Sequence, residues 1–144
     1  MKLSNVPLRL ATGAFILNSG LNKRNLPPEA AEGMQGMAAN AIPQVNNLSP
    51  QAFGKALSTG EIALGAALLT PFVSSKLAGA ALTGFGSGLV AMYLKTPGMT
   101  AEGSAFRPSQ DGTAIAKDIW LVGAGLSLLI SGLTPKRPII GKVR

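Results

Sequence analysis

The stretch from Lys55 to Lys95 constrains the fold most, because it holds two long apolar segments joined by a short hinge. The hinge, TPFVS at 70–74, contains a proline that ends the first segment. Glu61 is the only charged residue between Lys55 and Lys76, and no charge lies between Lys76 and Lys95. Each segment therefore has the roughly 20 mostly uncharged residues that a helix needs to cross a ~30 Å hydrocarbon layer.

Two further apolar segments flank this hairpin, and together they predict an all-α membrane protein, a bundle of four transmembrane helices. The chain has 144 residues, 47% apolar and only 13% charged, and its mean hydropathy is positive. A compact soluble all-α domain with deeply buried helices is the alternative. The transmembrane domain is expected at 1–135, with a basic tail at 136–144. Its helices are expected at about 5–22, 50–70, 75–95 and 114–133.

The first apolar segment, at 6–22, also fits a secretory signal peptide, because a basic start and a short apolar core are typical of both. No Ala-x-Ala cleavage pattern follows it, which favours an uncleaved helix. In the connection after it, apolar residues at spacings of three and four predict a short interfacial helix at about 28–42. Its Met34 and Met37 either pack against the bundle or form the lid of a pocket.

Small residues at fourfold spacing mark the helices expected at 75–95 and 114–133. In lipid, such rows hold a bundle together because they let helix backbones approach closely. We therefore place the 75–95 helix at the centre of the bundle, with a substrate path lined by glycine as the alternative. The expected packing residues are Ala80, Gly84 and Gly88; Gly79, Thr83 and Ser87; and Gly123 and Ser127.

The 13 basic residues occur singly or in pairs at the ends of apolar segments, not along one face between aromatic residues. This spacing excludes nucleic acid as the expected partner and favours anionic lipid headgroups. Arg9 and Lys76 are expected to anchor their helices by reaching these headgroups, and so are Lys136 and Arg137 in the tail.

Four crossings would place both termini and the 70–74 hinge on the same side of the membrane. The basic residues divide almost equally between the two sides, so their count discriminates little. Most acidic residues, and the interfacial aromatic residues Tyr93 and Trp120, fall on the side of the two long loops. These features predict a multi-pass protein of the cytoplasmic (inner) membrane of a bacterium, with both termini in the cytoplasm.

Glu61 is the residue that most suggests a site, because an ionised carboxylate two to three turns into a transmembrane helix is costly unless it is paired or protonated. Its depth predicts a polar cluster at the long-loop side of the bundle. The cluster either accepts a proton or binds a quinone headgroup, or it is a structural ion pair that ties helix ends together. Its candidate residues are Glu61, Asn18, Asn22, Lys23, Tyr93, Lys95, Lys117 and Asp118.

The absence of cysteine and histidine excludes disulfides, the usual zinc sites and His-ligated haem. It also removes the commonest general base. The GFGSG run at 84–88 resembles a nucleotide loop or a nucleophile elbow, but it lies inside an apolar helix with no preceding strand. An autonomous enzyme is therefore not expected, and we predict no cofactor bound by this chain alone, apart from a lipid or quinone at its surface.

The chain resembles the DoxX-like family of small four-helix membrane proteins, and the resemblance covers most of the helical part. Lys117-Asp118 resembles the usual opening of the family's fourth helix, and the run at 69–78, LTPFVSSKLA, is similar to its hinge after the second helix. The first two helices carry matching residues at Arg9, Gly13, Gly20 and Lys23, and at Glu61 and Gly65.

The resemblance implies membrane redox chemistry, because the members that gave the family its name are subunits of quinone-linked oxidoreductases. Without Cys or His, any electron-carrying centre would belong to a partner. The first hypothesis is thus a non-catalytic subunit that stabilises a larger, respiratory-type membrane complex. The second is a small carrier or a quinone- or lipid-binding protein that uses the Glu61 cluster. Membrane lipids and a protein complex are the expected partners.

Overall fold

The structure is a computed structural model that describes residues 2–135, so the basic tail with Lys136 and Arg137 lies outside the described residues. The all-α class is confirmed for this part of the chain, whose only β feature is an isolated bridge between Thr100 and Pro108. The long helices are α1 (Val6–Asn22), α2 (Pro28–Ala41), α3 (Pro50–Leu69), α4 (Ser75–Lys95) and α6 (Ile119–Leu133). The short helices are the 3-10 helices η1 (Leu3–Asn5) and η2 (Pro43–Asn47) and the single-turn α5 (Thr113–Ala116).

Serine residues start both helices of the central hairpin. The Ser49 hydroxyl accepts a hydrogen bond from the Ala52 amide at 3.2 Å, and the Ser74 hydroxyl accepts one from the Leu77 amide at the same distance. Each bond satisfies an amide that the first turn of a helix leaves without a partner. The helix expected at 114–133 is instead divided into α5 and α6, because a turn at 117–118 interrupts it.

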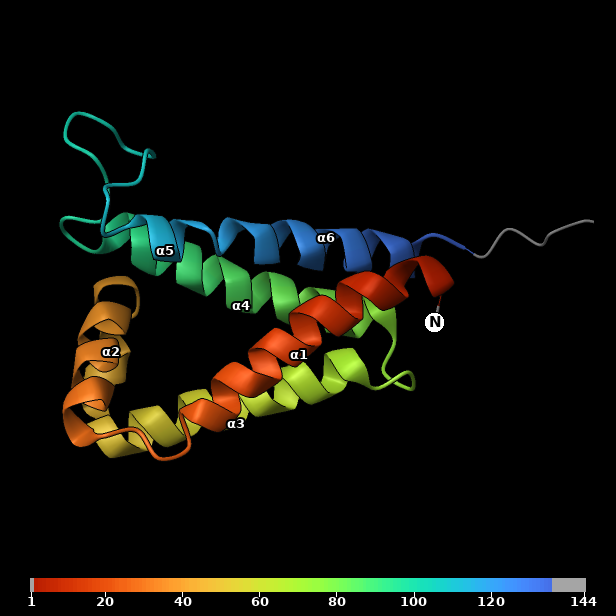
Figure 1. Cartoon of the computed structure of the whole chain (residues 1–144), viewed down its shortest axis with the longest axis horizontal. Helices are drawn as coiled ribbons and strands as arrows, with labels where there is room; N and C mark the ends of the chain where they lie inside the picture. Colours follow the sequence, from red (N-terminus) through yellow and green to blue (C-terminus); the bar gives the residue numbers. More distant parts are fainter. Residues whose placement is uncertain (1, 136–144) are drawn as a thin grey trace, which may run out of the picture.

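The helices form two antiparallel pairs, α1 with α3 and α4 with α6, as Figure 1 shows. The pairs meet near the α3–α4 hinge and diverge toward the opposite end, where α2 lies across the gap between them (Figure 1). Lys2 donates to the carbonyl of Ser131 at 2.8 Å, so the start of the chain and the end of α6 both lie at the hinge end. The two long connections lie at the open end.

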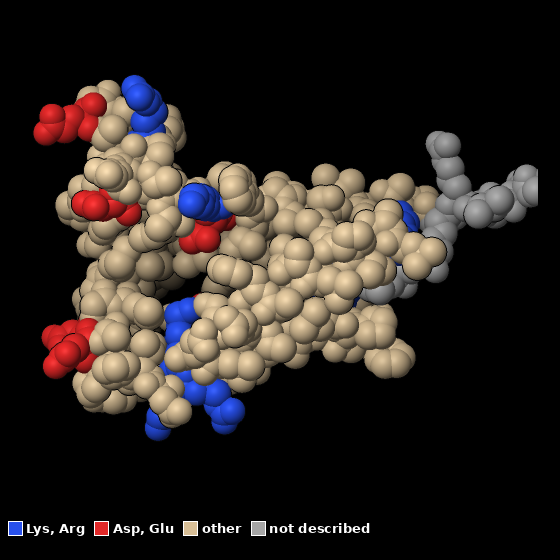
Figure 2. Space-filling view, viewed as in Figure 1, with Lys and Arg blue, Asp and Glu red and all other residues tan. Residues whose placement is uncertain are grey.

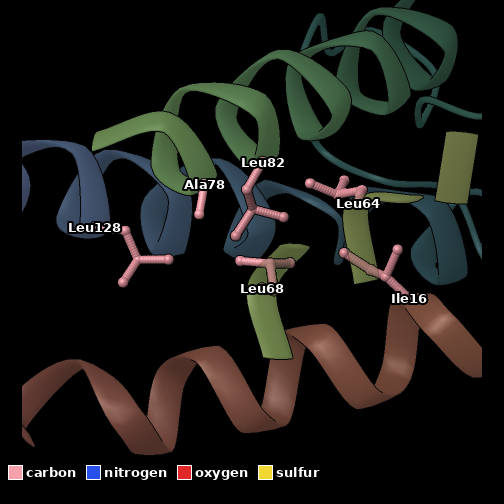
Figure 3. Packing of buried hydrophobic residues seen from close by; sticks show 6 residues of the cluster. All are labelled: Ile16, Leu64, Leu68, Ala78, Leu82 and Leu128. Carbon is pink, nitrogen blue, oxygen red and sulfur yellow. The ribbon is translucent and has the colours of Figure 1, made fainter. Parts of the chain in front are cut away.

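The apolar core sits where the two pairs meet. Its buried side chains come from all four long helices of the bundle, and Figure 3 shows them converging between the ribbons. Leu68, Leu82 and Leu128 are each at most 1% exposed. Moving a leucine side chain of this kind from water into a protein core contributes about 1.5–3 kcal/mol of free energy. The core residues are Ile16, Leu64, Leu68, Ala78, Leu82 and Leu128.

Glycines bring α4 and α6 into backbone contact. A Cβ on Gly79 would press on the backbone of Leu129 and lie 2.7 Å from the Gly125 carbonyl, and a Cβ on Gly125 would lie 2.5 Å from the Thr83 amide. Gly79 and Thr83 thus belong to the contact that small-residue rows were expected to make.

The other expected packing residues lie elsewhere. No atom would lie within 4 Å of a Cβ on Gly84, Gly88 or Gly123, and Ala80, Ser87 and Ser127 are exposed. On α4 it is Gly86 that makes the close contact with α6 instead, because a Cβ on Gly86 would lie 3.0 Å from the Val122 amide nitrogen. The face of α4 that contacts α6 is therefore not the face that holds Ala80, Gly84 and Gly88.

Arg9 is not a headgroup anchor, and that prediction was wrong. Its side chain is buried, with 1% of the residue exposed. The guanidinium donates to four carbonyl oxygens at 2.7–2.9 Å, those of Ala67, Leu68, Thr70 and Val73. The last carbonyls of α3 have no partner within the helix and form the negative end of its dipole, which explains why a buried cation is stable there.

Two helical segments of the described chain, Ser75–Lys95 and Thr113–Leu133, are long and apolar enough to cross a membrane by length and composition. The prediction of membrane helices is thus supported for two of the four segments. Charge is also distributed unevenly. Figure 2 shows acidic and basic side chains gathered at the end that holds α2 and the 96–112 loop, while the rest of this face is almost free of charge.

Candidate functional site

A cavity of about 380 Å³ lies between α2, α3 and α4, at the open end of the wedge that the two helix pairs form. Figure 2 shows a hollow on this face of the molecule at the corresponding place. The volume lies within the range of small-molecule sites. The wall is mostly apolar, and its residues are Lys23, Met34, Ala38, Ile42, Val45, Phe53, Leu57, Glu61, Gly84, Phe85, Gly88, Leu89 and Met92.

The cavity exists because α4 presents glycine where a side chain would otherwise fill the space. Gly84 and Gly88 lie one turn apart in its wall, and a Cβ on either would have no atom within 4 Å. Met34 from α2 contributes to the opposite wall, whereas Met37 is not among the lining residues. Glycines of α4 and Met34 of α2 therefore line the same cavity.

An ion pair forms the polar part of the wall. Lys23 Nζ lies 2.9 Å from Glu61 Oε2 and also donates to the Ser19 hydroxyl one helical turn earlier. Only 5% of the Glu61 side chain and 17% of the Lys23 side chain are exposed. The pair joins α1 to α3. Because a partner removes much of the cost of a buried charge, the pair explains how Glu61 is tolerated at this buried position.

The second carboxylate oxygen of Glu61, Oε1, has no hydrogen-bond partner among the described residues. In this part of the chain, every side-chain nitrogen or oxygen that is fully buried has a partner. Oε1 is therefore partly accessible, although Glu61 as a residue is only 4% exposed, and Glu61 lines the cavity.

Two smaller cavities adjoin the first at Glu61 and Phe85. One, of about 320 Å³, lies between α3 and α4, and its remaining wall residues are Ala56, Leu57, Gly60, Leu64 and Ala81. The other, of about 210 Å³, lies between α1 and the start of α6, and it also includes Ser19, Lys23 and Asp118. Glu61 and Phe85 thus lie in the walls of all three cavities, at their junction.

The structure brings some of the predicted cluster residues together and separates others. Lys23, Glu61 and Asp118 line the same 210 Å³ cavity. Tyr93 is buried, but its hydroxyl donates to the carbonyl of Phe106 at 2.9 Å and so fastens the 96–112 loop. The remaining candidates are exposed at the surface and line none of these three cavities: Asn18, Asn22, Lys95 and Lys117.

Phe85 is a wall residue of all three cavities that the sequence did not single out. Because an aromatic residue in an apolar helix is common, the sequence gives no sign that Phe85 lines a cavity. Only the divergence of α3 from α4 in the structure reveals it.

Lys23 already donates to both Glu61 and Ser19, so the Ser19–Lys23 contact is not a nucleophile with a free base. The site has the features of a binding pocket: an apolar body with one polar wall.

Within residues 2–135, no three His, Cys, Asp or Glu side chains gather in a way that could hold a metal ion. No protein-family model matches the chain, and neither a curated protein nor a solved structure matches it.

Proposed function

We propose that this protein is an integral membrane protein that binds a small amphiphile in the cavity between α2, α3 and α4. The observation that carries the proposal is the cavity itself, an apolar space of about 380 Å³ with the Lys23–Glu61 pair in its wall. A molecule with an apolar body and one polar group matches such a wall, because each part meets surface of its own kind.

The proposal includes four membrane crossings, by α1, α3, α4 and α6. The four helices run side by side in two pairs, so a bilayer that holds α4 and α6 also surrounds α1 and α3. Large apolar side chains are exposed on the outer faces of α1 and α4, as Phe15 and Leu77 illustrate, and Arg9, the only charge in α1, is buried. The cytoplasmic membrane, with both termini in the cytoplasm, is the orientation that we propose.

Filling the cavity tests the binding function. Gly84→Leu would place a side chain in the cavity without a clash, since nothing lies within 4 Å of its Cβ. Leucine also favours the helix by about 0.8 kcal/mol over glycine, so the variant is expected to fold. Native mass spectrometry of protein released from mild detergent is expected to show a bound lipid-sized mass on the wild type and little on Gly84→Leu.

Gly123→Leu is the matched control, because Gly123 has the same open surroundings on α6 but lines none of the three cavities. It is expected to carry as much bound mass as the wild type. Equal occupancy of wild type and Gly84→Leu would refute binding in this cavity.

A second candidate function is a non-catalytic subunit that packs against a larger, quinone-linked redox complex, as the DoxX-like resemblance implies. The observation that favours it is a set of small residues on α4 and α6 that no described residue covers: Ala80, Ser87, Gly123 and Ser127. Such surfaces allow close contact with a helix of another protein. Co-purification from mild detergent is expected to yield a heavier assembly that Gly123→Leu weakens, whereas a lone monomer under all conditions would contradict the idea.

A further inference from the structure

The groups around the junction of the three cavities include more acidic than basic side chains. One ammonium group, that of Lys23, and two carboxyl groups, those of Glu61 and Asp118, line the 210 Å³ cavity, and α4 contributes no charged residue to its wall. Lys23 is engaged by Glu61 Oε2 and Ser19, whereas Glu61 Oε1 is accessible and has no partner. The polar group that the wall lacks is therefore a hydrogen-bond donor.

The 320 Å³ cavity opens on the surface of the bundle between α3 and α4. Three of its wall residues, Ala56, Gly60 and Ala81, are exposed and have small side chains or none. The opening leads to the uncharged part of the bundle surface, because no charged residue other than Glu61 lies between Lys55 and Lys76, and α4 has charges only near its ends. On the membrane placement proposed above, acyl chains would face this opening.

We propose that the site takes a single-chain lipid with a hydrogen-bond-donating, non-anionic head, which enters from the bilayer between α3 and α4. Its head donates to Glu61 Oε1, its chain lies in the cavity between α2, α3 and α4, and the opening beside Gly60 is its entry from the bilayer. A carboxylate or phosphate head is disfavoured because it would face the Glu61 and Asp118 carboxyl groups in a space of low dielectric. This inference rests on the proposed binding function and adds the ligand's head chemistry and its route.

Three probes with the same chain and different heads test the head chemistry. Tetradecanol, tetradecylamine and tetradecanoate are titrated into the full-length protein in a non-ionic detergent, and native mass spectrometry measures the occupied fraction. A hydrogen bond to a charged acceptor corresponds to about tenfold in affinity, so the alcohol and the amine are expected to bind about tenfold more tightly than the carboxylate. Equal affinity of the three, or preference for tetradecanoate, would overturn the head assignment.

Asp118→Asn provides a second measurement that leaves the Lys23–Glu61 pair in place. Removal of one carboxyl group is expected to raise tetradecanoate affinity several-fold and to leave tetradecanol affinity nearly unchanged. A merely structural role of Asp118 would change both probes equally and would contradict the charge argument.

Gly60→Leu tests the route, because it would place a side chain in the opening at a position with no atom within 4 Å. The rate at which tetradecanol occupancy rises after mixing is expected to fall at least about fivefold in Gly60→Leu and to stay at the wild-type value in Gly123→Leu, since the added side chain fills the entry sterically. If Gly84→Leu abolishes binding and Gly60→Leu does not slow it, the proposed function stands and the route is wrong. If Gly84→Leu does not reduce binding, the proposed function itself fails.

Discussion

Replacement of Arg9 by methionine is expected to destabilise the bundle strongly, because Arg9 supplies partners for four carbonyl oxygens at the end of α3 and in the hinge. Methionine has a similar length but no donor, so all four carbonyls would lose this partner. At a net value of about 1 kcal/mol for each bond, the loss is about 4 kcal/mol. For a chain of this size that corresponds to a fall of about 15 °C in Tm.

Arg9→Lys keeps the charge but replaces the planar fork with a single nitrogen that has three donors. It can therefore satisfy at most three of the four carbonyls, and its Tm is expected to lie between those of the wild type and Arg9→Met. Arg24→Met is the matched control, because Arg24 is exposed.

Since the chain has no cysteine, thiol-reactive dyes cannot report its unfolding. The apparent Tm is instead read as the monodisperse fraction that survives heating, by size-exclusion chromatography in detergent. A difference of less than about 2 °C between Arg9→Met and Arg24→Met would refute the capping role.

Three further perturbations follow from the packing and the polar contacts. Gly79→Val is expected to separate α4 from α6 and to lower the apparent Tm by several degrees, whereas Gly123→Val, with open surroundings, leaves it unchanged. Lys23→Met leaves a buried carboxylate unpaired and is expected to cost about 3–5 kcal/mol, and adding Glu61→Gln is expected to restore most of that loss in the same heating assay. Tyr93→Phe removes the bond that fastens the 96–112 loop and is expected to speed cleavage after Glu102 by a glutamate-specific protease several-fold, with little change in Tm.

Helix positions could be read from the sequence because local signals set them. α3 and α4 begin at Pro50 and Ser75, where the caps and the hinge proline placed them, and α2 spans Pro28–Ala41, close to the expected 28–42. Such signals act within a few residues of the chain, and no knowledge of the partner helices is needed to read them.

The role of Arg9 could not be read in the same way. A cation near the end of an apolar segment looks the same in sequence whether it reaches out to a headgroup or inward to carbonyls. The outcome depends on the end of α3, which lies nearly 60 residues away in the chain. The glycine rows had the same ambiguity, because small residues occur on several faces of α4, and only the position of α6 selects the face that holds Gly79 and Gly86.

The place of the cavity follows from how differently the two ends of the bundle are connected. At one end the five-residue hinge and the Arg9 bonds hold α3 to α4 and α1 closely, and the apolar core lies near them. At the other end the long connections impose no such closeness, and glycines at 84 and 88 leave the space between α3 and α4 unfilled. Because the charged residues also concentrate at that open end, the Lys23–Glu61 pair lies in the cavity wall, where a ligand's polar group can reach it.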